Sequence, residues 1–161
     1  MEEGVGGGMK IRVANQSDVE ELVDAGRKAD NKSEELARKR VTNFLSNNKK
    51  MILIVEVNKK IVGYVGLKKE DDDLKVAKLI NLKKFAHINW IAVLPEFRGQ
   101  GIGSKLLSSC NKHIKRFGKK KIWLGCRKKM ISFYEKNKYV IAGSYIDKSK
   151  REEFVMVKTI K

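Results

Sequence analysis

Three glycines, Gly99, Gly101 and Gly103, stand at alternate positions between an apolar run and an amphipathic pattern. Residues 87–93 read as a strand, and residues 102–117 carry apolar side chains at helical spacing. A glycine turn from a strand into a helix collects unpaired backbone N–H groups at the positive end of the helix dipole. Because glycine has no Cβ, a phosphate can approach that backbone closely. The pattern predicts an anion site, although the same glycines also suit a tight connection without a ligand.

The spacing of these glycines matches neither of two common nucleotide motifs. The dinucleotide fingerprint is G-x-G-x-x-G, whereas this chain has G-x-G-x-G from Gly99. The Walker pattern ends in Gly-Lys-Ser/Thr, and Gly103-Ser104-Lys105 reverses the last two residues. A phosphate ligand is therefore predicted without support for ATP or a dinucleotide.

Two polar side chains interrupt the apolar strand just before the glycine loop. His87 and Asn89 share one strand face because side chains alternate along a strand. A histidine there can take a proton near neutral pH, and an asparagine can order water. The alternative is a histidine that is simply hydrogen-bonded within the fold. Glu56, on another expected strand, is a weaker candidate for a base.

The elements that must position these residues are strands and helices in mixed order. Strands are expected at residues 10–13, 51–57, 61–67, 87–93, 121–126, 139–145 and 153–158, and helices from 17, at 33–48, at 102–117 and around 130–134. A capping box from Ser17 to Glu20 opens the first helix, Ser33 opens the second, and Gly118 ends the third. Residues 74–85 fit a helix and a strand equally well. The pattern predicts a mixed sheet with helices on its faces.

The composition indicates one soluble intracellular domain. The chain has 161 residues, and residues 1–9 are expected to be a disordered extension before a domain at 10–161. The sequence shows neither a membrane span nor a signal peptide, so a cytoplasmic protein is expected. Cys110 and Cys126 are expected to be reduced, apolar packing residues, and no metal-ligand spacing is present.

The formal net charge is +17, which favours anionic partners such as nucleic acid, phosphorylated cofactors or acidic proteins. The lysines are spread in pairs along the chain, so a generally lysine-rich surface is an equally simple explanation. Without any nucleic-acid-reading motif, we do not expect nucleic acid or a membrane as a partner.

The segment Arg98–Gly103, with Val93-x-Pro95 ahead of it, resembles the Q/R-x-x-G-x-G/A signature of the GNAT superfamily of acetyl-CoA-dependent N-acetyltransferases. Ile11-Arg12, Ile61–Tyr64 and Phe133–Lys136 resemble other parts of that family, so the likeness covers most of residues 10–158. It implies a single α/β (α+β mixed) domain with a mixed, mostly antiparallel central sheet flanked by about four helices.

The resemblance also implies a cosubstrate, acetyl-CoA, held by the strand before the loop and by the loop amides, with no metal. The implied coenzyme-binding residues are Ile91, Ala92, Val93, Arg98, Gly99, Gln100, Gly101, Ile102, Gly103, Ser104, Arg127 and Tyr134. For Arg98, either the side chain adds charge near the phosphates or only its N–H takes part. Arg127 stands where many relatives have Asn or Gln and is expected at a coenzyme phosphate or an acidic substrate group.

For catalysis, the resemblance places Tyr134 beside the thioester sulfur as general acid, with core packing as its alternative. A backbone N–H near Val93 would stabilise the oxyanion. Relatives that modify protein N-termini often carry a Glu where this chain has Gly125, so the expected carboxylate is missing. His87 and Asn89 are the remaining candidates for handling the proton of the amine.

These observations predict an N-acetyltransferase that acts on a primary amine by direct attack. The amine is a protein N-terminus, a lysine or a small molecule, and the protein is a monomer or homodimer. The alternative is a regulatory or nucleic-acid-binding module that holds coenzyme A without turnover.

Overall fold

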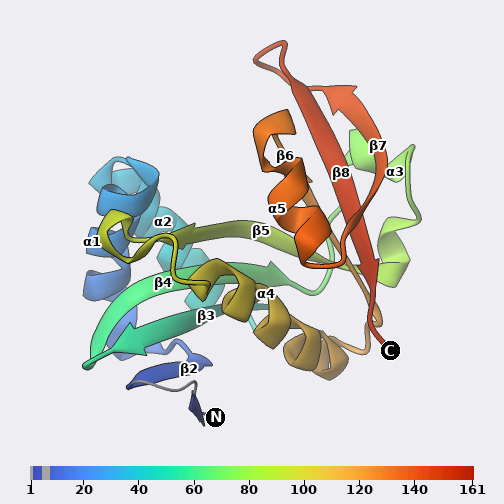
Figure 1. The fold of residues 1–161 in the computed structure, drawn as a ribbon. Coiled ribbons are helices and arrows are strands. Elements are labelled where there is room, and N and C mark those ends of the chain that lie inside the picture. Colours follow the sequence, from blue (N-terminus) through green and yellow to red (C-terminus); the bar gives the residue numbers. More distant parts are fainter. Residues whose placement is uncertain (1, 5–7) are drawn as a thin grey trace. The chain divides into compact units, whose positions relative to one another are not determined.

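The computed structural model describes residues 2–4 and 8–161. The strands are β1 (Glu2–Gly4), β2 (Met9–Val13), β3 (Lys50–Val57), β4 (Lys60–Lys68), β5 (Phe85–Val93), β6 (Lys121–Cys126), β7 (Val140–Ile146) and β8 (Glu152–Thr159). The α-helices are α1 (Val19–Asp30), α2 (Glu34–Leu45), α3 (Leu74–Ala77), α4 (Ile102–His113) and α5 (Ile131–Lys136). Strands and helices mix along the chain as the sequence predicts (Figure 1).

These elements form two compact units. The first unit comprises the described residues up to Leu67 together with Trp90–Cys110, and the second comprises Lys68–Asn89 together with Asn111–Lys161. Strand β5 therefore begins in the second unit and ends in the first, and α4 begins in the first and ends in the second. In the first unit the strand order is β1-β2-β3-β4 followed by the end of β5; in the second it is the start of β5, then β6-β8-β7.

The hairpin between β3 and β4 follows directly from its sequence. Both strands are nearly all apolar and rich in β-branched residues, and their central side chains are buried. Asn58 and Lys59 turn between them with φ of 51° and 64°, the left-handed pair that a tight two-residue hairpin turn requires. The predicted hairpin is confirmed.

The start of the first helix differs from its prediction. The capping box joins Asn15 and Asp18 instead of Ser17 and Glu20, and it precedes a short 3₁₀ turn, Gln16–Asp18. Ser17 N–H donates to Asn15 Oδ1 at 2.9 Å, and Asn15 N–H donates to Asp18 Oδ2 at 2.8 Å. Arg12 donates to both oxygens of the Asp18 carboxylate and so holds it where it accepts from Asn15 N–H.

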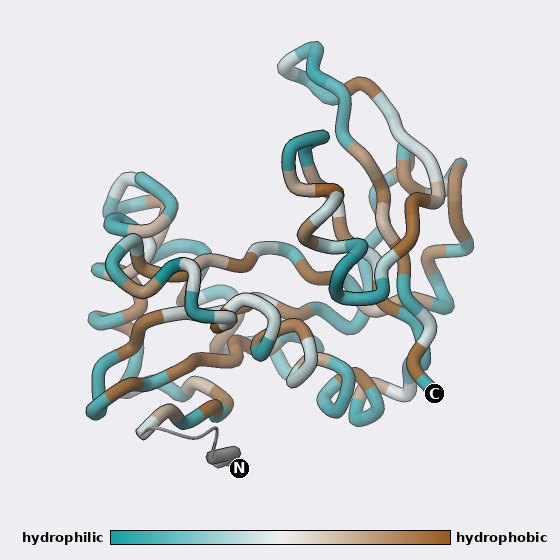
Figure 2. The backbone as a smooth tube through the Cα atoms, viewed as in Figure 1, coloured by the Kyte–Doolittle hydropathy of each residue, from teal (hydrophilic) through white to brown (hydrophobic). Residues whose placement is uncertain are grey.

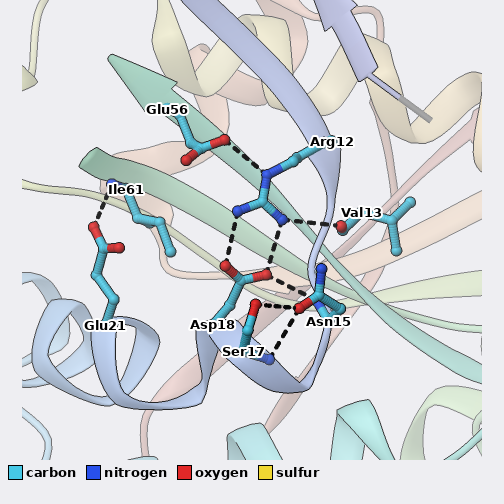
Figure 3. A network of polar contacts seen from close by, with 8 residues as sticks. All are labelled: Arg12, Val13, Asn15, Ser17, Asp18, Glu21, Glu56 and Ile61. Carbon is cyan, nitrogen blue, oxygen red and sulfur yellow. Dashed lines mark hydrogen bonds and ion pairs between the residues drawn. The ribbon is translucent and has the colours of Figure 1, made fainter. Parts of the chain in front are cut away.

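Arg12 links β2 to β3 and to the start of α1 (Figure 3). Its guanidinium donates to both oxygens of Asp18, at 2.8 and 2.7 Å, and to Glu56 Oε1 at 2.7 Å. These hydrogen bonds hold the pKa of Asp18 below its usual value and raise that of Arg12. In the same view, Ile61 N–H of β4 donates to Glu21 Oε2 of α1 at 2.6 Å. Glu56, a weaker sequence candidate for a base, is thus engaged in an ion pair.

The core of the first unit lies between its strands and the helices α1 and α2. Helix α2 begins after the predicted cap, Ser33, whose Oγ accepts from Leu36 N–H at 3.2 Å. Figure 2 shows hydrophobic residues concentrated along β3 and β4, with polar residues on turns and outer helical faces. The cluster includes Leu22, Val41, Phe44, Ile52, Ile54, Ile61 and Tyr64, all buried.

In the second unit, β5 and β6 pair in parallel over Phe85–His87 and Lys121–Trp123. Strand β8 pairs antiparallel with both β6 and β7, so the sheet is mixed, as predicted. Residues 74–85 resolve into α3, a 3₁₀ turn (Leu82–Lys84) and the first residue of β5. Val76 of α3 packs with Trp123 and Val155 on one sheet face, whereas α5 covers the other.

Residues 1–9 are predicted to be disordered, and of these residues 1 and 5–7 lie outside the part of the chain that the structure describes. Glu2–Gly4 instead has strand geometry and pairs antiparallel with β2, and Met9 already belongs to β2. Cys110 and Cys126 are buried and reduced, as expected. Among the described residues, no helix has the length and apolar character needed to cross a membrane.

Candidate active site

The glycine loop has the backbone conformation that its sequence predicts. Gly99 and Gly101 have φ of +78° and +80°, the left-handed region that L-residues avoid. A Cβ at either position would meet no atom within 4 Å, so conformation and not crowding demands glycine there. Gly103 differs from these two, because it lies inside the first turn of α4.

Helix α4 begins at Ile102, directly after the loop. Lys105 N–H donates to Gly101 O at 3.1 Å, and by helix geometry the amides of the first turn, Ile102 to Ser104, have no partner within the helix itself. Gly63 of β4 lets this helix start lie against the sheet: a Cβ there would be 3.1 Å from Ile102 Cγ2. The loop leads directly into the first residue of α4, so its amides stand at the positive end of the helix dipole, the position in which helices bind anions.

Arg98 is hydrogen-bonded within the fold through both its side chain and its N–H. Its Nε donates to Val93 O at 3.0 Å, and its Nη2 donates to Ala29 O, at the end of α1, at 3.2 Å. The side chain thus ties the end of β5 and the end of α1 to the loop. Arg98 N–H itself donates to Pro95 O at 3.3 Å. The guanidinium charge stays at the base of the loop while it holds the loop in position.

Ile91, Ala92 and Val93 form the last part of β5, immediately before the loop. They are half-buried, and the chain continues beside β4 because Leu94 N–H donates to Val62 O at 2.8 Å. The loop and these strand residues, with Arg98, Gln100 and Ser104, are therefore brought together in the first unit.

Tyr134 lies in α5 of the second unit and is buried, with 6% of its surface exposed. Its ring packs edge-on against Phe133 and Tyr139. Burial, together with the nearby Cys126 and Glu153, raises the pKa of Tyr134 to about 12. The phenol is therefore neutral near pH 7 and remains a hydrogen-bond donor.

His87 belongs to a buried cluster in the second unit that the sequence reveals only in part. Its ring stacks on Trp123 with centroids 3.8 Å apart, and its Nδ1 lies 2.8 Å from Asp71 Oδ2. Lys68 Nζ donates to the same Asp71 oxygen at 3.0 Å. Burial lowers the pKa of His87, whereas the contacts from His87 and Lys68 lower that of Asp71. Asn89, two residues on, is exposed.

Arg127 directly follows β6 and is held by acidic residues of the β7–β8 hairpin. Its Nη2 lies 2.6 Å from Asp147 Oδ2, and its Nη1 lies 3.5 Å from Glu153 Oε2. These two carboxylates are functional candidates that sequence reasoning missed, because both are more than 15 residues further along the chain. Only strand pairing brings them to Arg127.

The predicted site residues thus fall into two sets. The strand end and the loop lie in the first unit, whereas His87, Asn89, Arg127 and Tyr134 lie in the second. Among residues 2–4 and 8–161, no three His, Cys, Asp or Glu side chains are grouped to hold a metal ion.

The sequence profile of the acetyltransferase (GNAT) family matches residues 18–139. The chain is 31% identical over 126 residues to an uncharacterized N-acetyltransferase of Archaeoglobus fulgidus, covering 73% of this chain and 82% of the relative. The chain therefore belongs to the acetyltransferase (GNAT) family, as the loop signature predicts.

Solved structures agree on the fold. An aminoglycoside 6'-N-acetyltransferase complexed with coenzyme A superposes with a TM-score of 0.76 at 18% identity, covering 94% of this chain and 97% of that one. The ribosomal-protein-S18-alanine N-acetyltransferase of Escherichia coli gives a TM-score of 0.70 at 20% identity, with 95% and 94% covered. The predicted α/β fold with a mixed sheet is confirmed.

Proposed function

We propose that this protein transfers an acetyl group from acetyl-CoA to a primary amine by direct attack of the amine on the thioester. The observation that carries the proposal is the pair of left-handed glycines, Gly99 and Gly101, that leads β5 into the first turn of α4. Membership of the family and the coenzyme A complex of the aminoglycoside enzyme support the same donor.

The loop amides would hold the coenzyme's pyrophosphate. Gly99 to Ser104 supply the N–H groups, and the dipole of α4 adds a favourable potential for the negative charge. Ile91 to Val93 would pair with the pantetheine through backbone groups, so their side chains need no particular chemistry. Arg98 contributes by fixing the loop, since its donors are used on two carbonyls.

Tyr134 would serve the departing sulfur as a neutral donor. A phenol with a pKa of about 12 is a weaker acid than a thiol near 8.5, so complete transfer to the thiolate is uphill by about 5 kcal/mol. Tyr134 therefore has to regain a proton from the attacking nitrogen as it gives its own to sulfur. It acts as a relay, which couples departure of the thiolate to deprotonation of the nitrogen.

The acceptor is a primary amine, of a protein N-terminus, a lysine or a small molecule. Such amines differ in what they require, because an α-amino group has a pKa near 7.7–8.0 and a lysine near 10.4. The two structural neighbours are named for a small-molecule acceptor, an aminoglycoside, and for a protein acceptor, an alanine of a ribosomal protein. Both kinds belong in an acceptor screen.

The test has a binding arm and a transfer arm. Acetyl-CoA and ATP are titrated calorimetrically into the protein at physiological and at high salt, and thiol release is then followed with aminoglycosides, polyamines and short peptides. We expect saturable one-to-one binding of acetyl-CoA that survives high salt, and thiol release with at least one amine. Absence of acetyl-CoA binding, or its loss at high salt, would refute the proposal.

A further inference from the structure

Gly125 of β6 leaves a gap that a side chain from another strand occupies. Glu153 of β8 extends over it: a Cβ on Gly125 would lie 3.2 Å from Glu153 Oε1 and 3.3 Å from its Cγ. The two strands are paired antiparallel with Gly125 opposite Val155, so Glu153 reaches across from two positions further toward the start of β8. A carboxylate therefore stands where residue 125 itself provides none.

The Glu153 carboxylate is surrounded by groups that carry or donate protons. Burial raises the pKa of Tyr134, Cys126 and Tyr145, and the negative charge of Glu153 adds to each shift. Tyr145 is its direct cross-strand neighbour on β7. The carboxylate is thus in electrostatic contact with the residue proposed to serve the sulfur.

Two arginines and one carboxylate define the charge around Glu153. Arg127 lies 3.5 Å away but approaches Asp147 more closely, at 2.6 Å, and Arg151 contributes a weaker positive field. Because Asp147 takes the shorter ion pair, Glu153 is only partly neutralised. Its side chain is 19% exposed, so it is shielded from water without being sealed off from a substrate.

We propose that Glu153 accepts the proton of the acceptor amine, directly or through one water molecule. This inference rests on the proposed acetyl transfer, which needs a neutral nitrogen as nucleophile. At pH 7 only about one lysine-like amine in 2,500 is neutral. A carboxylate beside the amine that accepts its proton therefore makes the reactive, neutral form available.

The protons balance in this scheme. Glu153 takes one proton from R–NH3⁺ and later releases it to water. The neutral nitrogen forms a bond to the thioester carbon, and the carbon–sulfur bond breaks as the intermediate collapses. The second nitrogen proton replaces the one that Tyr134 gives to the sulfur. The products are the amide, the free thiol and one released proton.

Burial adds to the basicity of this carboxylate. Desolvation raises the pKa of Glu153 above the usual value of 4.5, Arg127 and Arg151 oppose the shift, and Asp147 adds to it. A raised pKa brings the group closer to working pH, where a general base is most effective.

The experiment compares Glu153→Gln with its neighbour Glu152→Gln. Glu152 is exposed and its carboxylate accepts from Ser144 Oγ at 2.8 Å, which makes it a matched control. With a lysine or polyamine acceptor, we expect Glu153→Gln to lower kcat/KM by about 10² to 10⁴-fold. The affinity for acetyl-CoA should stay within about twofold, and Glu152→Gln should stay near the wild type on both measures.

A relocation variant tests the position of the carboxylate. Glu153→Ala removes it from β8, and adding Gly125→Glu supplies one from β6 to the same space. The double variant should recover at least about tenfold of the activity lost in Glu153→Ala alone. In Glu153→Gln, kcat/KM for a lysine acceptor should rise about tenfold per pH unit up to the pKa of the amine, because only the amine that is already neutral reacts, whereas His87→Gln should keep the wild-type pH profile.

The outcomes separate this inference from the function on which it rests. If the wild type transfers acetyl groups and Glu153→Gln matches it across the pH range, Glu153 is not the base. If His87→Gln shows that rise of about tenfold per pH unit and Glu153→Gln keeps the wild-type profile, the role belongs to His87 and the inference is overturned. If the wild type binds acetyl-CoA but acetylates no amine, both proposals fall together.

Discussion

The role of the glycine loop can be tested by replacing Gly101, because Gly118 provides a matched control position outside the loop. Gly101 and Gly118 both have left-handed backbones, with φ of +80° and +73°, and a Cβ at either would meet no atom within 4 Å. Gly118 ends the 3₁₀ turn Ile114–Phe117, which follows α4, whereas Gly101 precedes the first residue of that helix. Replacing either residue by Ala imposes the same kind of backbone strain.

The cost to stability should therefore be alike in the two variants. A left-handed Ala costs about 1–2 kcal/mol, and the stiffer unfolded chain offsets about 0.4–1 kcal/mol. The net loss is about 1 kcal/mol, a fall in Tm of about 2–4 °C for a chain of this size.

Their effects on acetyl-CoA should differ sharply. If Gly101→Ala turns away one amide that donates to a phosphate, about 1.5–3 kcal/mol is lost, a weakening of roughly 10- to 150-fold. Gly118→Ala should bind as the wild type does. Calorimetric titration of both variants, with Tm measured on the same samples, makes the comparison. Equal affinities in Gly101→Ala and Gly118→Ala, at equal Tm, would refute the assignment of the loop.

Three further predictions address Tyr134, His87 and Arg12. Tyr134→Phe should lower kcat by about 100-fold in the thiol-release assay and leave the Kd for acetyl-CoA unchanged; a matching fall in affinity would make the residue a packing element instead. Because the pKa of His87 is lowered by burial, the unfolded chain binds the proton more readily, so the free energy of unfolding should fall as the pH drops below about 6.5. Urea titrations should show a smaller fall in His87→Phe, which retains a ring against Trp123, and an unchanged slope would contradict the burial argument. Asp18→Asn should destabilise the fold by roughly 2–4 kcal/mol because Arg12 is left in a largely buried place without its bidentate partner. Asp24→Asn, which breaks only the exposed pair with Lys28, is its control, and an equal loss in both would discount the Arg12 network.

Several elements could be predicted because their signals are local. Asn58-Lys59-Lys60 between two β-branched runs indicates the hairpin, and Gly118 with Lys115 and Arg116 before it marks the end of the α4 segment. The predicted capping box begins two residues too late, because Asn15 and Ser17 both suit a cap. The choice between them depends on Arg12, which holds Asp18 from the neighbouring strand.

Residues 74–85 could not be assigned from their pattern for a comparable reason. Leu74 and Val76 both look like core residues, yet Leu74 is 80% exposed and Val76 is fully buried. Val76 packs with Trp123 and Val155, which come from distant parts of the chain, and a Cβ on Gly143 of β7 would lie 2.9 Å from Leu79. The hydrophobic pattern of residues 74–85 contains no information about these distant partners, so it cannot predict which of its side chains are buried.

By itself, the sequence determined the loop from Gly99 to Gly103, the helix that follows it and the family to which they belong. The left-handed backbone of Gly99 and Gly101 is a local property that glycine favours, so the sequence alone indicates the turn. Tertiary structure alone decided that Arg98 binds two carbonyls and that Asp71 lies against His87. It also decided that Glu153 fills the space beside Gly125. Apart from the bond between Arg98 and Val93 O, these contacts join residues at least 16 positions apart in the chain, and strand pairing and packing fix them after the local elements have formed.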